Sequence, residues 1–483
     1  MAGVRRAFFW ATTGRYLVML VNLAVAFIMA RLIGPAAFGV SVIGGAAYAI
    51  AEALRELGGG AYLIQQRELT LEKIRTSVTT SVIASIAISL CMYFSADLVA
   101  SFYDLPEVKR YIQVAAIAYV LGPFIFPVFA LMSREMAFRS FALVNVSMAV
   151  SGGATGITLA HLGFGYMSLA WASVASTVVG SALCFFLYSN HSIYHPTLSD
   201  WRSVLGFGAF DSATALIAAI GEQAPYLVIG RVLDSASVGI AQRSVLLSVF
   251  PERVILAGVS AVALPTFSRS VRENSDTRTT YLNAIELITV IQWPCLILLA
   301  ALSTPLIKLL LGAQWLEAAS LVKVLCFAAA FSFPFALQYP ILVAVGGVKS
   351  LPLLVAGQAM LNTAAVAIVA KQGLFAIAWC LAWVVPLNAL VAVTIVRRHL
   401  RFRWREFFAA LRSSIAVSVL SAIGPALLIW NKGTSDLSIA AALAGTLLFA
   451  FGWSAGLILT QHPLLHELLR ALRRSKALYQ PTV

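Results

Sequence analysis

Four arginines, Arg15, Arg55, Arg243 and Arg253, stand inside long apolar stretches of the chain. An ionised side chain in a hydrocarbon environment is costly unless it is paired or faces water, so each of them is a candidate functional residue. The guanidinium group is planar and donates two parallel hydrogen bonds, which suits carboxylate and phosphate oxygens. The four arginines therefore indicate either an anion-binding cavity or ion pairs that hold apolar segments together.

The second interpretation has support from neighbouring residues. Glu52 lies three positions before Arg55 and four before Glu56, and Glu252 directly precedes Arg253. Residues three or four positions apart on a helix meet on one face, so Glu52, Arg55 and Glu56 form one patch in which a carboxylate can pair with the arginine. Both interpretations stay open for these two arginines.

Two further acidic residues, Asp211 and Glu222, lie eleven positions apart in one apolar stretch. Eleven residues make about three helical turns, which places both side chains on one face. They are either counter-ions to Arg15 and Arg243 or the groups that bind a coupling H⁺ or Na⁺. Buried carboxylates can titrate near neutral pH, as proton coupling requires.

The composition shows which elements must position these residues. Of the 483 residues, 60% are hydrophobic and 11% are charged, whereas a soluble chain carries about 25% charged residues. That excludes an ordinary soluble protein and predicts an all-α integral membrane protein with about 14 transmembrane helices. The apolar stretches are long and uniform, which argues against an outer-membrane barrel.

The hydropathy pattern groups the spans as six, six and two. The first six are expected at 9–33, 38–57, 78–102, 111–132, 141–162 and 167–189. The next six are expected at 204–229, 238–267, 281–311, 321–345, 351–370 and 374–396, and the last pair at 413–430 and 437–459.

The positive charges predict the orientation in the membrane. The net charge is +14, and with a cytoplasmic amino terminus 22 of the 34 Lys and Arg fall on the cytoplasmic side and seven on the other. Such a bias indicates an even number of spans with both ends cytoplasmic. Because the cations do not gather on a water-exposed domain, we expect no nucleic-acid partner.

No cofactor or metal site is expected. All five cysteines fall inside apolar segments and form no Cys-x-x-Cys pair, which excludes the usual zinc spacing. The basic, aromatic stretch 397–405 predicts an anchor to anionic lipid headgroups, and the amphipathic tail 462–476 is expected on the inner membrane surface.

The chain contains an internal repeat. Residues 31–40 align with residues 231–240 at an offset of 200, with Arg, Ala and Gly coinciding. With six spans each, the two halves keep the same orientation and are parallel repeats. We therefore expect an N-terminal six-helix lobe at 1–195, a second six-helix lobe at 196–400, and a basic linker, a helix pair and a basic cytoplasmic tail at 401–483.

The first copy of the repeated segment resembles a known family. Arg31, Gly34, Pro35, Phe38 and Gly39 fit the A-R-x-L-G-P-x-x-F-G signature of the polysaccharide transporter family, the Wzx-type oligosaccharide flippases. The segment 98–103 and the arrangement of six, six and two helices are also similar to that family.

The resemblance implies a function. Such proteins belong to the superfamily of multidrug, oligosaccharidyl-lipid and polysaccharide exporters, with two six-helix lobes around a central cavity. The implied substrate is an undecaprenyl-diphosphate-linked oligosaccharide repeat unit. The protein would flip it across the inner (cytoplasmic) membrane by alternating access, for export of exopolysaccharide, capsule or O-antigen. The polysaccharide polymerase and export machinery are the implied partners, and the four arginines would bind the diphosphate.

Two other functions are compatible with a helical membrane protein of this kind. A drug or metabolite exporter of the same superfamily would prefer an acidic or aromatic pocket to four arginines inside the spans. An integral membrane glycosyltransferase or polymerase would need catalytic residues in a long loop outside the membrane, and the sequence has no such loop. We therefore expect a transporter and not an enzyme.

Overall fold

The computed structural model describes the chain except for residues 1, 56–58, 433–438, 468 and 471–483. All the elements of the described residues are helices. They form two compact units, unit 1 (Met1–Ile240) and unit 2 (Ala241–Val483), and each unit is described by itself.

Unit 1 contains long helices with two short 3₁₀ turns, and its last helix, α10, continues into unit 2. The elements are α1 (Ala2–Leu32), α2 (Pro35–Ala53), α3 (Gly60–Gln65), α4 (Leu71–Tyr103), α5 (Pro106–Leu121), η2 (Gly122–Phe124), α6 (Phe126–Arg134), α7 (Phe138–His161), α8 (Met167–Leu187), η3 (His191–Tyr194), α9 (Trp201–Val232) and α10 (Ser235–Ser248).

Unit 2 has the same character. Its elements are α11 (Phe250–Arg272), α12 (Thr277–Ala301), α13 (Ser303–Leu310), η4 (Ala313–Trp315), α14 (Glu317–Ala329), α15 (Phe333–Ala344), η5 (Val348–Ser350), α16 (Leu351–Val369), η6 (Ala370–Gln372), α17 (Leu374–Leu400), α18 (Trp404–Lys432) and α19 (Ile439–Leu459).

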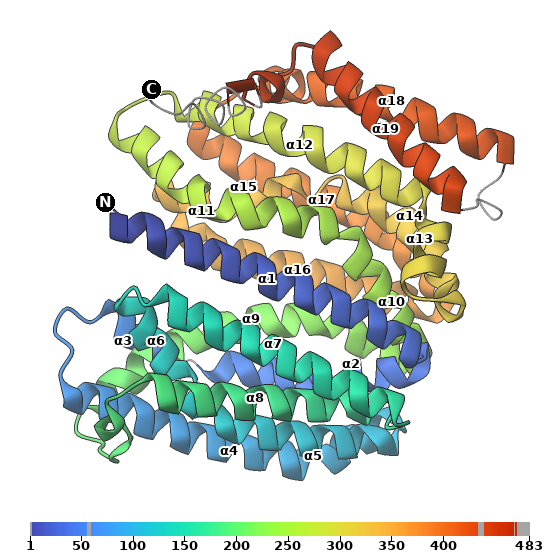
Figure 1. Cartoon of the computed structure of the whole chain (residues 1–483). Helices are drawn as coiled ribbons and strands as arrows, with labels where there is room; N and C mark the ends of the chain where they lie inside the picture. Colours follow the sequence, from blue (N-terminus) through green and yellow to red (C-terminus); the bar gives the residue numbers. More distant parts are fainter. Residues whose placement is uncertain (1, 56–58, 433–438, 468, 471–483) are drawn as a thin grey trace, which may run out of the picture. The chain divides into compact units, whose positions relative to one another are not determined.

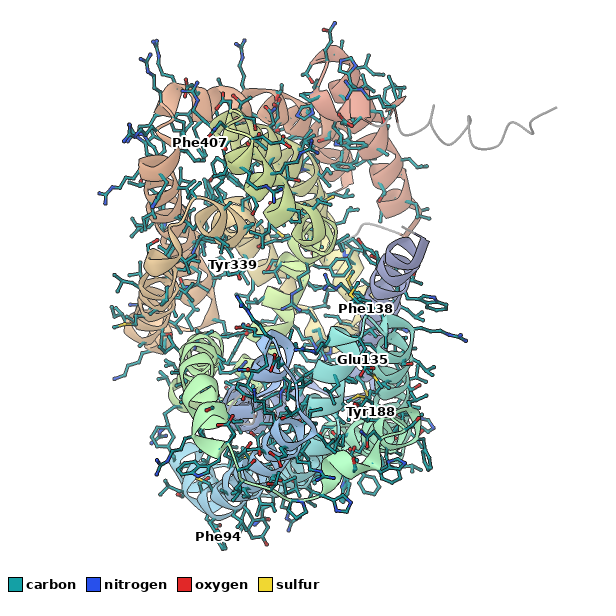
Figure 2. All side chains as sticks on the ribbon, turned by 90° about the vertical axis from the view of Figure 1, so that its left-hand side faces the viewer. Phe94, Glu135, Phe138, Tyr188, Tyr339 and Phe407 are labelled. Carbon is teal, nitrogen blue, oxygen red and sulfur yellow. The ribbon has the colours of Figure 1, made fainter. Side chains whose placement is uncertain are left out.

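The helices confirm an all-α membrane protein. Twelve helical segments of the described chain are long and apolar enough to cross a bilayer. The two other expected spans coincide with α9 and with the α10–α11 pair, which do not meet the same criterion, so the count of 14 stays a prediction. Large apolar side chains of the spans are exposed, as lipid contact requires. Phe94 of α4, 75% exposed, stands at the outer edge of unit 1 (Figure 2).

Proline divides several of the expected spans. The span expected at 238–267 consists of α10 and α11, separated at Val249 just before Pro251. Proline lacks the amide hydrogen of a regular helix, and its ring clashes with the carbonyl four residues earlier. Hydropathy alone does not register such breaks, because the apolar character continues through them.

The fourth expected span of each half is broken in the same way. In the first half α5 ends at Leu121 and α6 begins with Phe126 and Pro127, and in the second half α14 ends at Ala329 and α15 begins with Phe333 and Pro334. Contacts between helices repeat as well: α4 with α5, α5 with α8 and α7 with α8 correspond to α12 with α14, α14 with α17 and α16 with α17. These correspondences support the internal repeat.

Small residues bring the helices of unit 1 close together. Side by side in Figure 1, α1, α7 and α8 pack along their length. A Cβ added to Gly153 of α7 would lie 2.4 Å from Val25 of α1, and one added to Gly152 would lie 3.1 Å from Ser176 of α8. Close approach at small residues drives helix association where lipid surrounds the helices.

The last two helices pack on α12 in unit 2. Val290 of α12, Val417 of α18 and Leu457 of α19 form a small buried cluster. The Trp453 indole donates a hydrogen bond of 3.0 Å to the carbonyl of Val290. A larger apolar core at one end of unit 2 includes Phe407 (Figure 2).

Candidate functional site

The candidate arginines of unit 1 lie in different environments. Arg15 is exposed on α1, next to Gly14, which is buried against Ala142 of α7. Arg55 follows the end of α2 and is half-buried. It forms an ion pair of 2.5 Å with Glu52, and its guanidinium carbon lies 3.6 Å from the centre of the Phe126 ring. Arg55 therefore contacts both the Glu52 carboxylate and the ring of Phe126, the first residue of α6 after the break.

Arg243 is buried inside unit 2. It is 4% exposed on α10, and its guanidinium carbon lies 5.9 Å from the ring of Trp315, which is fully buried. An arginine over an indole gains a cation–π interaction that is strongest where water is excluded. Arg243 is therefore the candidate that the fold removes from solvent most completely among the four.

Arg253 and Glu252 point to different surroundings. Arg253 is exposed, whereas Glu252 accepts a hydrogen bond of 2.5 Å from the Ser332 hydroxyl at the break between α14 and α15. No ion pair described in the structure joins Arg253 to Glu252. The carboxylate expected to balance Arg253 thus bonds a neutral partner.

The two acidic candidates of α9 are described unequally. Glu222 is exposed, and the side chain of Asp211 lies outside the described residues. Glu56, the second expected partner of Arg55, also lies outside them.

The signature residues form the connection between α1 and α2. Gly34 caps α2, Pro35 is the first residue of that helix, and Arg31 is exposed in the last turn of α1. Proline is favoured at this position because its fixed φ suits a helix start and its missing N–H has no partner there. Phe38 is 7% exposed.

Gly39 meets the second copy of the repeated segment within unit 1. A Cβ at Gly39 would lie 1.6 Å from the carbonyl oxygen of Ser235, and one at Gly239 would lie 2.3 Å from the carbonyl oxygen of Pro35. Ser235 and Gly239 are the repeat equivalents of Pro35 and Gly39 at the offset of 200. The starts of α2 and α10 therefore pack reciprocally, and only glycine permits the approach of the two backbones.

The same side of unit 1 carries further contacts between α4 and α9. The Tyr103 hydroxyl donates to the carbonyl of Leu227 at 3.2 Å, and Arg231 forms an ion pair of 3.4 Å with Asp104. Beside them lies an apolar groove of about 620 Å³, lined by α2, α4 and α9. Segment 98–103, which is similar to the polysaccharide transporter family, therefore contributes to a surface on which α9 packs.

Sequence reasoning missed a buried polar cluster in unit 2. Gln292 of α12 is fully buried, and its amide nitrogen donates to Ser332 at 2.9 Å and to the carbonyl of Ala329 at 3.1 Å. Trp293 donates to the next carbonyl, that of Ala330, at 2.6 Å. The repeated Phe-Pro pair at 126–127 and 333–334 is the signal that could have located this break.

A second polar cluster holds the segment after α19. The imidazole Nε2 of buried His462 lies 3.6 Å from the Glu286 carboxylate of α12, which also accepts a hydrogen bond of 2.5 Å from Ser413 of α18. Burial lowers the pKa of His462, while the negative charge of Glu286 acts in the opposite direction. The start of the tail thus packs into unit 2, and residues 471–476 of the expected surface helix lie outside the described residues.

Comparison with known proteins identifies the family. Residues 28–320 match the model of a family described as polysaccharide biosynthesis protein. This chain belongs to that family. The matched residues include both copies of the repeated segment, and the match confirms the family resemblance read from Arg31 to Gly39.

Named relatives of the chain are distant in sequence. The lipopolysaccharide biosynthesis protein WzxC of Escherichia coli is 22% identical over 66% of the chain, which spans 65% of WzxC. The succinoglycan biosynthesis transport protein ExoT of Rhizobium meliloti is 24% identical over 93% of the chain and 91% of ExoT.

A solved structure shares the fold of this family member. The inward closed conformation of the lipid II flippase MurJ has a TM-score of 0.71 over 92% of the chain and 98% of the MurJ chain, at 13% identity. At this identity the likeness concerns the fold alone.

Proposed function

We propose that the protein flips undecaprenyl-diphosphate-linked oligosaccharide repeat units across the bacterial inner membrane for the assembly of a surface polysaccharide. The observation that carries this proposal is the similarity to ExoT, a protein named for transport in succinoglycan biosynthesis, over 93% of the chain. The fold of the lipid II flippase MurJ supports it further, because lipid II is also a lipid-linked sugar.

In this proposal the arginines hold the diphosphate. Arg15, Arg243 and Arg253 offer planar two-pronged donors to phosphate oxygens. Arg55 takes part together with Glu52, with which it forms an ion pair. Burial of Arg243 supports the assignment, because a phosphate is bound more strongly where water is excluded.

We assign Asp211 and Glu222 of α9 the role of counter-ions to cavity arginines. We prefer this role to the binding of a coupling H⁺ or Na⁺ by these two carboxylates.

The proposed transport cycle is alternating access. The lobes 1–195 and 196–400 would rock around a central site, with both termini in the cytoplasm and with the polysaccharide polymerase and export machinery as partners. The repeated break in the fourth helix of each half supports two equivalent moving parts. The charge bias of 22 cations against seven supports the orientation.

The experiment that tests this function is deletion of the gene followed by lipid analysis. We expect loss of the surface polysaccharide and accumulation of the undecaprenyl-diphosphate-linked repeat unit on the cytoplasmic leaflet, with recovery on expression of the wild-type chain. Loss of the linked intermediate itself would instead indicate an enzyme that assembles it. Unchanged polysaccharide together with altered drug sensitivity would indicate an exporter.

A further inference from the structure

The repeat brings two glutamates into equivalent positions with different partners. Glu52 and Glu252 are separated by the offset of 200 that relates the signature segments. Glu52 forms an ion pair with Arg55. The position equivalent to Arg55 in the second half is Ile255, so Glu252 lacks the corresponding cation.

Glu252 instead contacts the break between α14 and α15. Its carboxylate oxygen Oε2 accepts a hydrogen bond of 2.5 Å from the Ser332 hydroxyl. The Ser332 oxygen also lies 2.9 Å from the carbonyl oxygen of Ala329, in the last turn of α14. A hydroxyl group has one hydrogen and two lone pairs, so it can donate to only one of these two acceptors at a time.

Gln292 completes the cluster. Its amide nitrogen donates to Ser332 and to Ala329. Because the Ala329 carbonyl can only accept, the orientation of the amide is fixed. Its oxygen Oε1 is buried and has no donor among the described residues.

The same atoms satisfy both protonation states of Glu252. When the carboxylate is ionised, Ser332 donates to it, and Gln292 donates to both Ser332 and Ala329. When Glu252 is protonated, its O–H donates to Ser332, whose own hydrogen turns to the Ala329 carbonyl. Uptake of one proton therefore reverses the hydrogen bond between Glu252 and Ser332 and adds one from the Ser332 hydroxyl to the Ala329 carbonyl, which also accepts from the Ser332 amide at 3.0 Å.

The charged groups around the cluster leave this exchange possible. Arg253, the next residue on α11, is exposed. The facing helix α15 contains no Asp, Glu, Lys or Arg, and its tyrosine, Tyr339, is 61% exposed. On α12 the carboxylate of Glu286 is bonded to Ser413 of α18, and on α14 Lys323 lines a separate groove facing α12 and α18.

We propose that Glu252, together with Ser332 and Gln292, is the proton-binding site that couples a proton gradient to transport. The break between α14 and α15 is the element that responds to the proton. Glu52, its counterpart in the first half, forms an ion pair with Arg55. This inference rests on the proposed function for its transport readout, and its proton-binding part can be measured without transport.

The first measurement is a pH-difference infrared spectrum of the purified full-length protein. We expect the wild type to show the band of a carboxylic acid that loses its proton as the pH rises, and Glu252→Gln to lack it. Ser332→Ala should retain the band and shift the pH at which it titrates. The matched controls Glu52→Gln and Glu273→Gln, the latter at an exposed ion pair with Arg269, should retain the wild-type band. A band that persists in Glu252→Gln overturns the proposal.

The second measurement is transport in phosphatidylethanolamine and phosphatidylglycerol vesicles, with a short-chain polyprenyl diphosphate that carries a fluorescent disaccharide. Wild type should respond to an imposed pH gradient, and Glu252→Gln should transport equally with and without it. A retained pH response in Glu252→Gln, or dependence on a Na⁺ gradient in place of protons, overturns the inference. Absence of wild-type transport while the infrared band depends on Glu252 supports proton binding at this site and contradicts the proposed function.

Discussion

Gly39 and Ser235 approach so closely that a methyl group on Gly39 would lie 1.6 Å from the Ser235 carbonyl oxygen. Because the obstacle is backbone, no side-chain rotation relieves it. The reciprocal approach of Gly239 to Pro35 shows that the two copies of the repeat meet at the starts of α2 and α10. The structure therefore explains why the signature has glycine at position 39: a residue without a Cβ lets the two copies of the repeat pack together.

Replacement of Gly39 tests this contact. We expect Gly39→Ala to destabilise the protein by about 1–3 kcal/mol or more, the usual cost of overpacking, and thermal unfolding of the detergent-purified protein would measure it. Gly357→Ala on α16 is the matched control, because a Cβ there meets nothing within 4 Å. Equal midpoints for the two variants would contradict the close approach.

Arg134 should stabilise the end of the short helix α3. It donates to the carbonyls of Leu63 at 3.0 Å and Gln66 at 2.6 Å, among others in the same turn. We expect Arg134→Ala to cost about 1–3 kcal/mol, because part-buried acceptors lose their donor. Arg134→Lys should recover only part of it, since an ammonium group lacks the planar fork of arginine.

Thermal unfolding again provides the measurement for Arg134. The exposed Arg110 supplies the control, and Arg110→Ala should change the midpoint little. A midpoint for Arg134→Ala equal to that of Arg110→Ala would show that the carbonyls find other donors.

The segment after α19 should detach at low pH. Because burial lowers the pKa of His462, the unfolded segment takes up a proton at a higher pH than the packed one. The packed form therefore loses stability as the pH falls below about 6.5, the ordinary value for histidine. Limited proteolysis should cut this segment faster at pH 5.5 than at pH 7.5. The rates are divided by the cleavage rate of a denatured substrate at the same pH, which corrects for the pH dependence of the protease.

His462→Gln removes the titrating group from this segment. Its cleavage should depend less on pH than that of the wild type. If the wild-type segment were cut equally fast at both values, the buried imidazole would not control its packing.

Arg243 provides a test of the anion-binding proposal. Arg243→Ala should abolish complementation of a deletion strain, and Arg243→Lys should retain part of it, because the charge persists while the two-pronged geometry is lost. Surface polysaccharide is the readout, with the amount of folded protein in the membrane measured in parallel. Full complementation by a folded Arg243→Ala chain would remove Arg243 from the binding site.

The partner of Glu252 in the structure differs from its neighbour in the sequence. The sequence places Glu252 beside Arg253, which leaves an ion pair between them as one of two interpretations. The structure directs the carboxylate to Ser332, eighty positions further along the chain. Neighbours in sequence on a helix point in different directions, and the partner of a side chain depends on which helix packs against its face.

Hydropathy and the repeat were sufficient to predict the helical membrane fold, the positions of most spans and the family. Long apolar runs require helices in a bilayer, because every backbone polar group must be satisfied within its own segment. These properties are local along the chain and can be read from it directly.

Only the tertiary structure decided which polar groups meet. Glu252, Gln292 and Ser332 come from three separate segments, and no spacing rule connects them. The contact of Gly39 with Ser235 also depends on how α2 and α10 pack. The sequence by itself determined where most of the apolar spans lie and to which family the chain belongs. Close packing selected the hydrogen-bond partners, because these are set by distances across helices and not along them.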